Sequence, residues 1–207
     1  MLKPAAIPGG PAAAIAAASE LAPYLSDLAK AHSGFDDPDA LLDSAYALCR
    51  DAASGEGDPF ALLRQAKTRA HLAIAAGDLS GEYDLSQTTG HITRFADAAL
   101  QAAMRIALKE RDLNETGLFA IALGKMGAFE LNYSSDIDFA VFFDRDRFEG
   151  GDREPADAAV RVIRRAIRLL NDRTRDGYVF RTDLRLRPDP SSTPLAVSTR
   201  RAALYYE

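Results

Sequence analysis

Residues 118–144 read LFAIALGKMGAFELNYSSDIDFAVFFD, and this stretch decides the fold. It begins with an uninterrupted apolar run, Leu118–Leu123, between two glycines, which predicts a strand buried on both faces. After a polar turn the residues alternate with a period of two, which predicts a second strand with Asp138 on one face. The opposite, core-facing side chains of that strand are Ile137, Phe139, Val141 and Phe143. A sheet therefore begins at residue 118.

The sequence before this stretch is rich in alanine and predicts a helical region. The predicted helices are short ones within 12–27, then 40–53 with Asp39 as its cap, 59–76 ending at Gly77, and 93–114 with Thr93 as its cap. We therefore divide the chain into a helical N-terminal region, residues 1–114, and a sheet-containing region, residues 115–207.

The sequence after residue 144 predicts a helix and two further strands. The helix follows the Gly150-Gly151 turn, has Asp152 as its cap, and carries four arginines off its apolar stripe, at positions 161, 164, 165 and 168. A strand from Gly177 would place Phe180, Thr182, Leu184 and Leu186 on one face and Val179, Arg181, Asp183, Arg185 and Arg187 on the other. Residues 193–198 predict a fourth strand and 199–207 a helix. The fold class is α/β: a helical region followed by a small mixed sheet, with helices on one face and the acids on the other.

Composition excludes several classes of protein. With 30 acidic and 25 basic residues the net charge is −5, which argues against general nucleic-acid binding, so any phosphate site must be local. The single cysteine, Cys49, cannot form an internal disulfide, which favours a reducing compartment and the cytoplasm. No run approaches the roughly 18 apolar residues of a membrane span.

The turn between the first two strands holds the residues suited to chemistry. Gly124 and Gly127 let the backbone approach a ligand closely, so that N–H groups can point at an anion, and Ser134 and Ser135 add hydroxyl donors. Asp136 and Asp138 are two apart on a strand and project from one face, as carboxylates that hold divalent ions do. Asp183 on a later strand supplies a third acid. Three carboxylates and neighbouring arginines suit phosphoryl or nucleotidyl transfer with Mg²⁺, or with Mn²⁺ in its place.

The Asp-x-Asp pair alone carries little information. Chance gives roughly two such pairs in a chain of this composition, and the sequence has three, at 37/39, 136/138 and 144/146. The arginines beside Asp183 can also be a solvated sheet face. The histidines at 32, 71 and 91 have no carboxylate or cysteine at ligand spacing, so we interpret them as non-catalytic.

The segment GKMGAFELNYSSDID at 124–138, followed by FRTDLRLRP at 180–188, resembles the bifunctional glutamine synthetase adenylyltransferase/adenylyl-removing enzymes. Domains of that family belong to the DNA polymerase β-like nucleotidyltransferase superfamily. The motif Glu-Leu-Asn-x-Ser-Ser-Asp-Ile-Asp at 130–138 resembles that of the N-terminal, adenylyl-removing copy of the domain. The resemblance is specific over about 118–205 and weak over 1–110. Ala128 stands where the family more often has a glycine.

The resemblance implies a role for each matching residue. Asp136 and Asp138 would be the paired metal ligands and catalytic residues, and Asp183 the third carboxylate. The nucleotide and phosphate would be bound by the turn and the nearby cations, namely Gly124, Lys125, Gly127, Ser134, Ser135, Arg181, Arg185 and Arg187.

The implied reaction is phosphorolysis. Inorganic phosphate would attack the AMP phosphorus of adenylyl-tyrosine on glutamine synthetase, giving ADP and unmodified synthetase. The implied partners are adenylylated glutamine synthetase, phosphate, an adenine nucleotide and a PII signalling protein, with neither nucleic acid nor membrane.

Two alternatives stay open. The same fold could be the adenylylating half, in which ATP donates AMP to the synthetase. It could also be a non-catalytic module that senses a signalling protein or glutamine, with the acids kept only as a charged surface.

Overall fold

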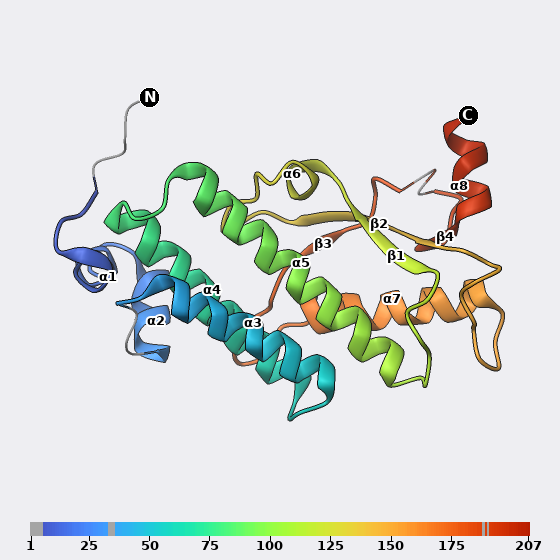
Figure 1. The fold of residues 1–207 in the computed structure, drawn as a ribbon, viewed down its shortest axis with the longest axis horizontal. Helices are drawn as coiled ribbons and strands as arrows, with labels where there is room; N and C mark the ends of the chain where they lie inside the picture. The colour runs from blue at the N-terminus through green and yellow to red at the C-terminus, as the bar shows by residue number, and fades with distance from the viewer. Residues whose placement is uncertain (1–5, 33–35, 188, 190) are drawn as a thin grey trace.

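The computed structural model describes residues 6–32, 36–187, 189 and 191–207, and it has a helical part followed by a small sheet with its own helices (Figure 1). The helical part comprises α1 (Gly10–Ser19), α2 (Pro23–Ala31), α3 (Pro38–Ser54), α4 (Pro59–Ser80) and α5 (Leu85–Lys109). The second part comprises β1 (Leu118–Ala122), α6 (Gly124–Gly127), β2 (Ile137–Phe143), α7 (Pro155–Asn171), β3 (Thr182–Asp183), β4 (Ala196–Ser198) and α8 (Thr199–Tyr206). The predicted α/β class is confirmed.

The mixed sheet is built around β2. On one edge β1 runs antiparallel to it, with Leu118 opposite Phe143. On the other edge β3 and β4 run parallel to it in succession, β3 beside its first residues and β4 beside its last. Because β2 is paired on both edges, the acids at its beginning are fixed relative to β3 by backbone hydrogen bonds.

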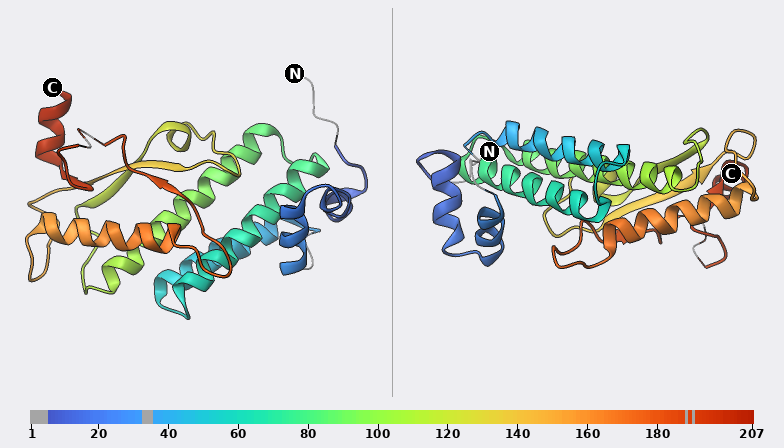
Figure 2. Two further views of the ribbon diagram at one scale, coloured as in Figure 1. Left: turned by 180° about the vertical axis from the view of Figure 1, so that it is seen from behind. Right: turned by 90° about the horizontal axis from the view of Figure 1, so that it is seen from below.

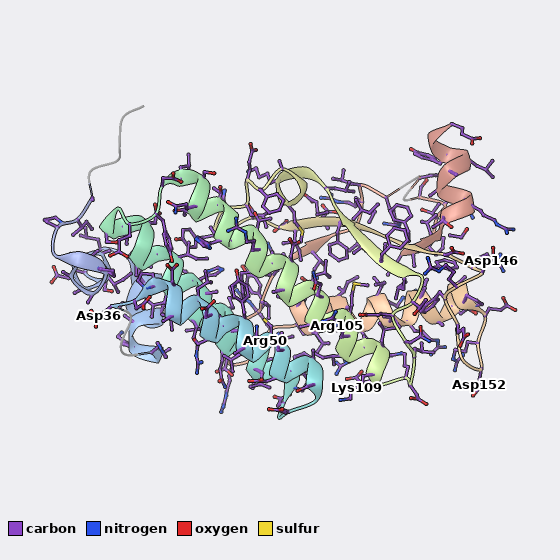
Figure 3. All side chains as sticks on the ribbon, viewed as in Figure 1. Asp36, Arg50, Arg105, Lys109, Asp146 and Asp152 are labelled. Atoms are coloured by element: carbon purple, nitrogen blue, oxygen red, sulfur yellow. The ribbon has the colours of Figure 1, made fainter. Side chains whose placement is uncertain are left out.

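Helices α5 and α7 lie against one face of the sheet, and α3 and α4 pack on the far side of α5 (Figures 1 and 2). Polar contacts join the helix ends: Lys109 in the last turn of α5 donates a hydrogen bond to the Ser54 carbonyl at the end of α3, and Arg105 pairs with Glu115 at 3.0 Å. Figure 3 labels Arg105 and Lys109 on α5. The long α5 therefore connects the helical region to the sheet.

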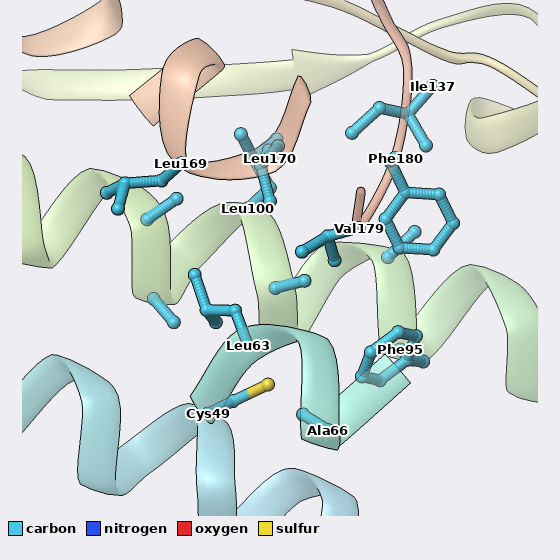
Figure 4. Close-up of a cluster of buried hydrophobic side chains, with 14 of the residues drawn as sticks. Cys49, Leu63, Ala66, Phe95, Leu100, Ile137, Leu169, Leu170, Val179 and Phe180 are labelled. Atoms are coloured by element: carbon cyan, nitrogen blue, oxygen red, sulfur yellow. The ribbon is translucent and has the colours of Figure 1, made fainter. Parts of the chain in front are cut away.

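One hydrophobic core runs through both parts of the chain (Figure 4). Leu63 of α4 and Phe95 of α5 belong to the same cluster as Ile137 of β2 and Leu170 of α7. Cys49 lies in it on α3 with 3% of its surface exposed, and burial raises the pKa of its thiol. The helical region therefore packs directly behind the sheet that carries the acids.

Several predicted helix ends are wrong, and for α3 and α5 the reason is that a different side chain caps the helix. Asp37, not Asp39, accepts the capping bond of α3. Helix α5 begins eight residues before Thr93, where Asp84 and Gln87 form a capping box, and Thr93 is buried inside it, donating to the Thr89 carbonyl. Gly77, the predicted end of α4, lies inside that helix, where the missing side chain lets the Tyr83 ring approach. Glu154, rather than the predicted cap Asp152, is the residue before α7.

Two strand predictions also need correction. Strand β1 is not buried on both faces, because Phe119 and Ile121 are 42% and 47% exposed on the side away from α5 and α7. The strand expected from Gly177 shrinks to Thr182–Asp183. The reason is that the N–H groups of Val179 and Phe180 both bond to the Leu170 carbonyl at the end of α7 instead of to a neighbouring strand.

None of the helices in the described residues is long and apolar enough to span a membrane.

His71 of α4 gives the core a pH dependence. Its imidazole is fully buried, with the Tyr24 hydroxyl 2.6 Å from Nδ1, and burial, reinforced by the Lys67 charge, lowers its pKa to about 3. As the pH falls, His71 therefore binds a proton in the unfolded state before it does so in the folded state. The contribution of His71 to stability is complete above the unfolded pKa of about 6.5 and is lost as the pH falls from there toward 3.

The His71→Phe variant is expected to lose less stability on acidification than the wild type. Between pH 7 and pH 5 the free energy of unfolding of the wild type should drop by about 2 kcal/mol more than that of the variant. Urea unfolding at the two pH values measures this difference. His32→Phe is the control, since that side chain is half-exposed, and equal pH slopes for wild type and His71→Phe would contradict the prediction.

Candidate active site

The structure places Asp138 directly opposite Asp183. The two residues are register partners in the parallel pairing of β2 with β3, so their side chains project from the same face of the sheet. Asp136 lies two residues before Asp138, at the entrance to β2. The sequence prediction that these three acids belong to one part of the molecule agrees with this placement.

The turn before β2 is fixed by its own side chains. Asn132 accepts a hydrogen bond from the Ser134 N–H at 3.0 Å, and the Asn132 N–H donates to the Ser135 hydroxyl at 3.0 Å. Such Asx-type bonds hold a tight turn in one shape. They set the direction in which the chain enters Asp136.

Helix α7 fixes β3 from the other side. Asn171, its last residue, both donates to the Thr182 hydroxyl and accepts from the Thr182 N–H, each at 3.0 Å. The Ile137 N–H donates to the Arg181 carbonyl at 2.9 Å, joining β2 to the start of β3. Asp183 is therefore held next to β2 although its strand is only two residues long.

The electrostatics of the three acids differ. Burial raises the pKa of Asp138, and the negative charges of Asp183 and Asp136 raise it further, while Arg185 and Lys125 oppose the rise. Hydrogen bonds from Arg185 lower the pKa of Asp183. Asp138 thus lies among like charges, where a cation would be stabilised.

Arginines form ion pairs with two of the three carboxylates. Arg181 pairs with Asp136 at 2.5 Å and also donates to the Ser134 carbonyl. Arg185 pairs with Asp183, and the Arg185 side chain is 84% exposed. In this arrangement the described residues hold no group of three acid, histidine or cysteine side chains set to bind a metal ion. Turning the two exposed arginines outward would free the carboxylates of Asp136 and Asp183. Together with Asp138 they would offer the hard oxygen ligands that Mg²⁺ prefers.

The glycine turn is a short helix, α6, that ends in a Schellman motif. The Glu130 N–H bonds to the Lys125 carbonyl at 2.8 Å, and the Phe129 N–H bonds to the Met126 carbonyl. The left-handed residue is Phe129, with φ of 60°, whereas Ala128 is right-handed. Position 128 therefore needs no glycine, which explains how the turn keeps its shape with alanine there.

Gly124 makes room for the Asp138 carboxylate. Its φ is +52°, and a Cβ added to it would lie 2.5 Å from Oδ2 of Asp138. A methyl group there would push the carboxylate out of place as well as strain the backbone.

The Gly124→Ala variant is expected to bind Mn²⁺ roughly 10- to 100-fold more weakly than the wild type, the usual cost of disturbing a ligand's support. Titration of the chain with Mn²⁺ measures this. Gly177→Ala is the matched control, because Gly177 also has a positive φ, +83°, but nothing within 4 Å of the added methyl group. Equal Mn²⁺ affinity in the two variants would contradict the role assigned to Gly124.

A hollow of about 980 Å³ opens beside these acids. It lies between the end of α7 and β3, and five of the predicted site residues line it, namely Asp136, Arg181, Asp183, Arg185 and Arg187. Arg187 also donates to the carbonyls of Leu184 and Thr193, so that it fastens the segment after β3. The other predicted site residues lie outside this lining, namely Gly124, Lys125, Gly127, Ser134, Ser135 and Asp138. Of these, Lys125 lies near enough to Asp138 to lower its pKa.

Two cations of α4 that the sequence did not single out support the site from behind. Arg64 of α4 is 1% exposed and donates to the carbonyls of Leu169, Asp172 and Gly177. Lys67, one turn later, donates to the Tyr178 carbonyl at 2.9 Å and lies 4.2 Å from the centre of that ring. Burial, with the charges of Arg64 and Arg181, lowers the pKa of Lys67 to about 8. The sequence gives little signal for either residue, because the same helix also carries Arg69 and other polar side chains.

Comparison with known proteins gives consistent matches. The family model for glutamate-ammonia ligase adenylyltransferase matches residues 13–207. Three relatives bear the name bifunctional glutamine synthetase adenylyltransferase/adenylyl-removing enzyme. The one from Caulobacter vibrioides is 42% identical over 209 residues, which cover 89% of this chain and 21% of the relative. The one from Bradyrhizobium sp. strain ORS 278 is 44% identical over 211 residues (91% and 21%), and the one from Rhizobium meliloti 40% over 223 (93% and 22%).

The chain spans about a fifth of the length of these curated relatives. The family match covers both the helical region and the sheet, including the turn and all three acids. The chain belongs to the glutamate-ammonia ligase adenylyltransferase family.

Proposed function

We propose that this chain is the adenylyl-removing part of a glutamine synthetase adenylyltransferase and that it catalyses phosphorolysis. An oxygen of inorganic phosphate attacks the phosphorus of the AMP group on a synthetase tyrosine. The bond from that phosphorus to the tyrosine oxygen breaks, the tyrosine oxygen takes a proton, and ADP leaves.

The pairing of Asp138 with Asp183 across β2 and β3 carries this proposal. It places two carboxylates on adjacent strands with a third, Asp136, two residues away. Burial raises the pKa of Asp138, and the negative charges of Asp183 and Asp136 raise it further. Phosphoryl and nucleotidyl transfer need such a site because two anions must approach each other.

Asp136, Asp138 and Asp183 would hold Mg²⁺, or Mn²⁺ in its place. Bound there, the metal would supply charge stabilisation for the attacking and leaving oxygens. The fit rests on the hard oxygen donors and on the space that Gly124 leaves beside Asp138. Arg181 and Arg185, released from their carboxylates, would then be available to the phosphates.

The chain's own cations would bind and orient the substrates. Arg181 and Arg185 line the hollow beside the acids and are largely exposed, so their forked donors can meet phosphate oxygens. Lys125, on the exposed turn near Asp138, would contact a phosphate from the opposite side. Gly127 and the serines at 134 and 135 would shape the turn that receives it.

The partners follow from the proposed reaction. Adenylylated glutamine synthetase would be the protein substrate, in agreement with the names of the relatives. Control by a PII signalling protein and a cytoplasmic location belong to the same proposal.

The test separates removal of AMP from its addition. Adenylylated glutamine synthetase, labelled inorganic phosphate and Mg²⁺ are incubated with the chain, and labelled ADP is measured; the proposal expects ADP that depends on both phosphate and metal. A parallel reaction supplies unmodified synthetase and ATP. Labelling of the synthetase with release of pyrophosphate, without ADP formation in the first reaction, would identify the adenylylating half and overturn the proposal. The absence of both reactions and of any Mn²⁺ binding would instead identify a non-catalytic module.

A further inference from the structure

Helix α7 carries a basic surface that the proposed reaction does not use. Of its arginines at 161, 164, 165 and 168, each lies three or four positions from two of the others, so they share one face of the helix. Together with Arg111, just after the end of α5, they line a hollow of about 440 Å³. The only acid in that lining is Asp157, and none of the three acids of the candidate active site takes part in it.

Two of these guanidiniums are held in place. Arg165 makes a forked pair with Glu110 through Nε and Nη2, at 2.9 and 2.7 Å, and lies over the Phe60 ring. Arg111 donates to the Ala107 carbonyl at 2.7 Å and lies 3.6 Å from Glu110. Because a guanidinium has five N–H donors, each of these side chains keeps donors for a ligand after these bonds are made.

Two others make no ion pair within the described residues. Arg161 and Arg164 are exposed, and within the described part of the chain no acidic side chain pairs with either. Arg168 pairs with Asp172 at 3.5 Å, with both side chains largely exposed. The hollow therefore has a clear surplus of positive charge in a chain whose net charge is −5.

This arrangement weakens the helix that carries it. Like charges three or four positions apart destabilise a helix, and the four arginines form such pairs along nearly two turns. A bound anion would remove the repulsion and bridge the two helices. A hollow with converging guanidiniums suits a compact ligand of high charge density, since forked donors match phosphate oxygens.

We propose that the hollow between the end of α5 and α7 binds a compact anion with two or more phosphate groups, separate from the candidate active site. The phosphate groups of a nucleotide and inorganic polyphosphate share this chemistry. The ligand would hold the exposed Arg161 and Arg164 against the already fixed Arg165 and Arg111. This site stands independently of the proposed phosphorolysis, because it shares no acid with it.

The test is calorimetric titration of the 207-residue chain, without divalent metal and at low salt, with inorganic tripolyphosphate and separately with ATP. We expect saturable binding of one equivalent, weakened at least 10-fold in the R161Q/R164Q variant and weakened by added salt. The matched control is R145Q/R175Q, which removes two arginines that lie outside this hollow. A further variant, R181Q/R185Q, removes the two exposed arginines of the candidate active site and should keep this binding, which separates the two sites.

The two ligands distinguish the source of the phosphates: binding of tripolyphosphate indicates that the phosphate chain suffices, and binding of ATP alone indicates a nucleotide. Binding of either ligand supports the site if it is lost in R161Q/R164Q and kept in R145Q/R175Q. Thermal unfolding checks the fold, because R161Q/R164Q should be at least as stable as the wild type without ligand and should lose the rise in Tm that tripolyphosphate gives. No saturable binding of either ligand, or an equal loss in R145Q/R175Q, would overturn the proposal.

Discussion

Replacing Asp138 with asparagine is expected to lower phosphate-dependent ADP release from adenylylated glutamine synthetase by roughly 10²–10³-fold or more, the scale of losing one electrostatic catalyst. Asn keeps the shape of the side chain but removes the charge that would hold a cation beside Asp183. The fold should persist, because Asp138 is half-buried on the sheet face away from α5 and α7, and the substitution removes no side chain from the main core.

 Circular dichroism and the urea midpoint of the variant should therefore stay close to those of the wild type.

Two measurements make this prediction specific. Asp146→Asn is the matched control, since Asp146 belongs to another Asp-x-Asp pair and its exposed carboxylate pairs with Arg200 at the surface. It should keep full activity. Mn²⁺ titration of both variants should show weaker binding in Asp138→Asn alone. Turnover by Asp138→Asn equal to that of the wild type would rule out the catalytic role of this carboxylate.

The sequence predicts the placement of β2 and its acids well, because alternation with a period of two is a direct property of a strand. Ile137, Phe139 and Val141 are buried in the main core as predicted, and Asp138 lies on the other face. The sequence could not reveal that Ala140 and Phe142 are also buried, because their cover comes from β4 and α8, far along the chain.

Other features depend on contacts that no local pattern reveals. The length of β3 is set by the Leu170 carbonyl, which takes the N–H groups that a longer strand would have used. The arginine stripe after Phe180 splits into separate roles, with Arg181 and Arg185 on carboxylates and Arg187 on backbone carbonyls. Alternation alone treats these three residues as equivalent.

Arg64 is the clearest case of a residue whose role needs the fold. Its side chain crosses from α4 to the end of α7 and to the turn before β3, where it donates to the carbonyls of Leu169, Asp172 and Gly177. These acceptors come from a helix end and a turn, which have no helical partners of their own. Arg64 thereby ties the helical region to the segment that leads to Asp183.

Replacing Arg64 with alanine is therefore expected to lower the free energy of unfolding by about 3–5 kcal/mol, because buried carbonyl groups lose their donors and a cavity remains. Urea unfolding measures the loss. Arg50→Ala is the matched control: Arg50 is exposed on α3, and its removal should cost less than about 0.5 kcal/mol.

A lysine at position 64 separates charge from geometry. Arg64→Lys keeps the charge but has a single nitrogen, which cannot reach acceptors on α7 and in the following turn at once. It should recover less than half of the stability lost in Arg64→Ala. Hydrogen exchange should show the loss locally as well, at the amides of Val179 and Phe180, which bond to the end of α7. Arg64→Lys with wild-type stability would show that the charge alone, rather than the three separate hydrogen bonds, holds α4 to the segment before β3.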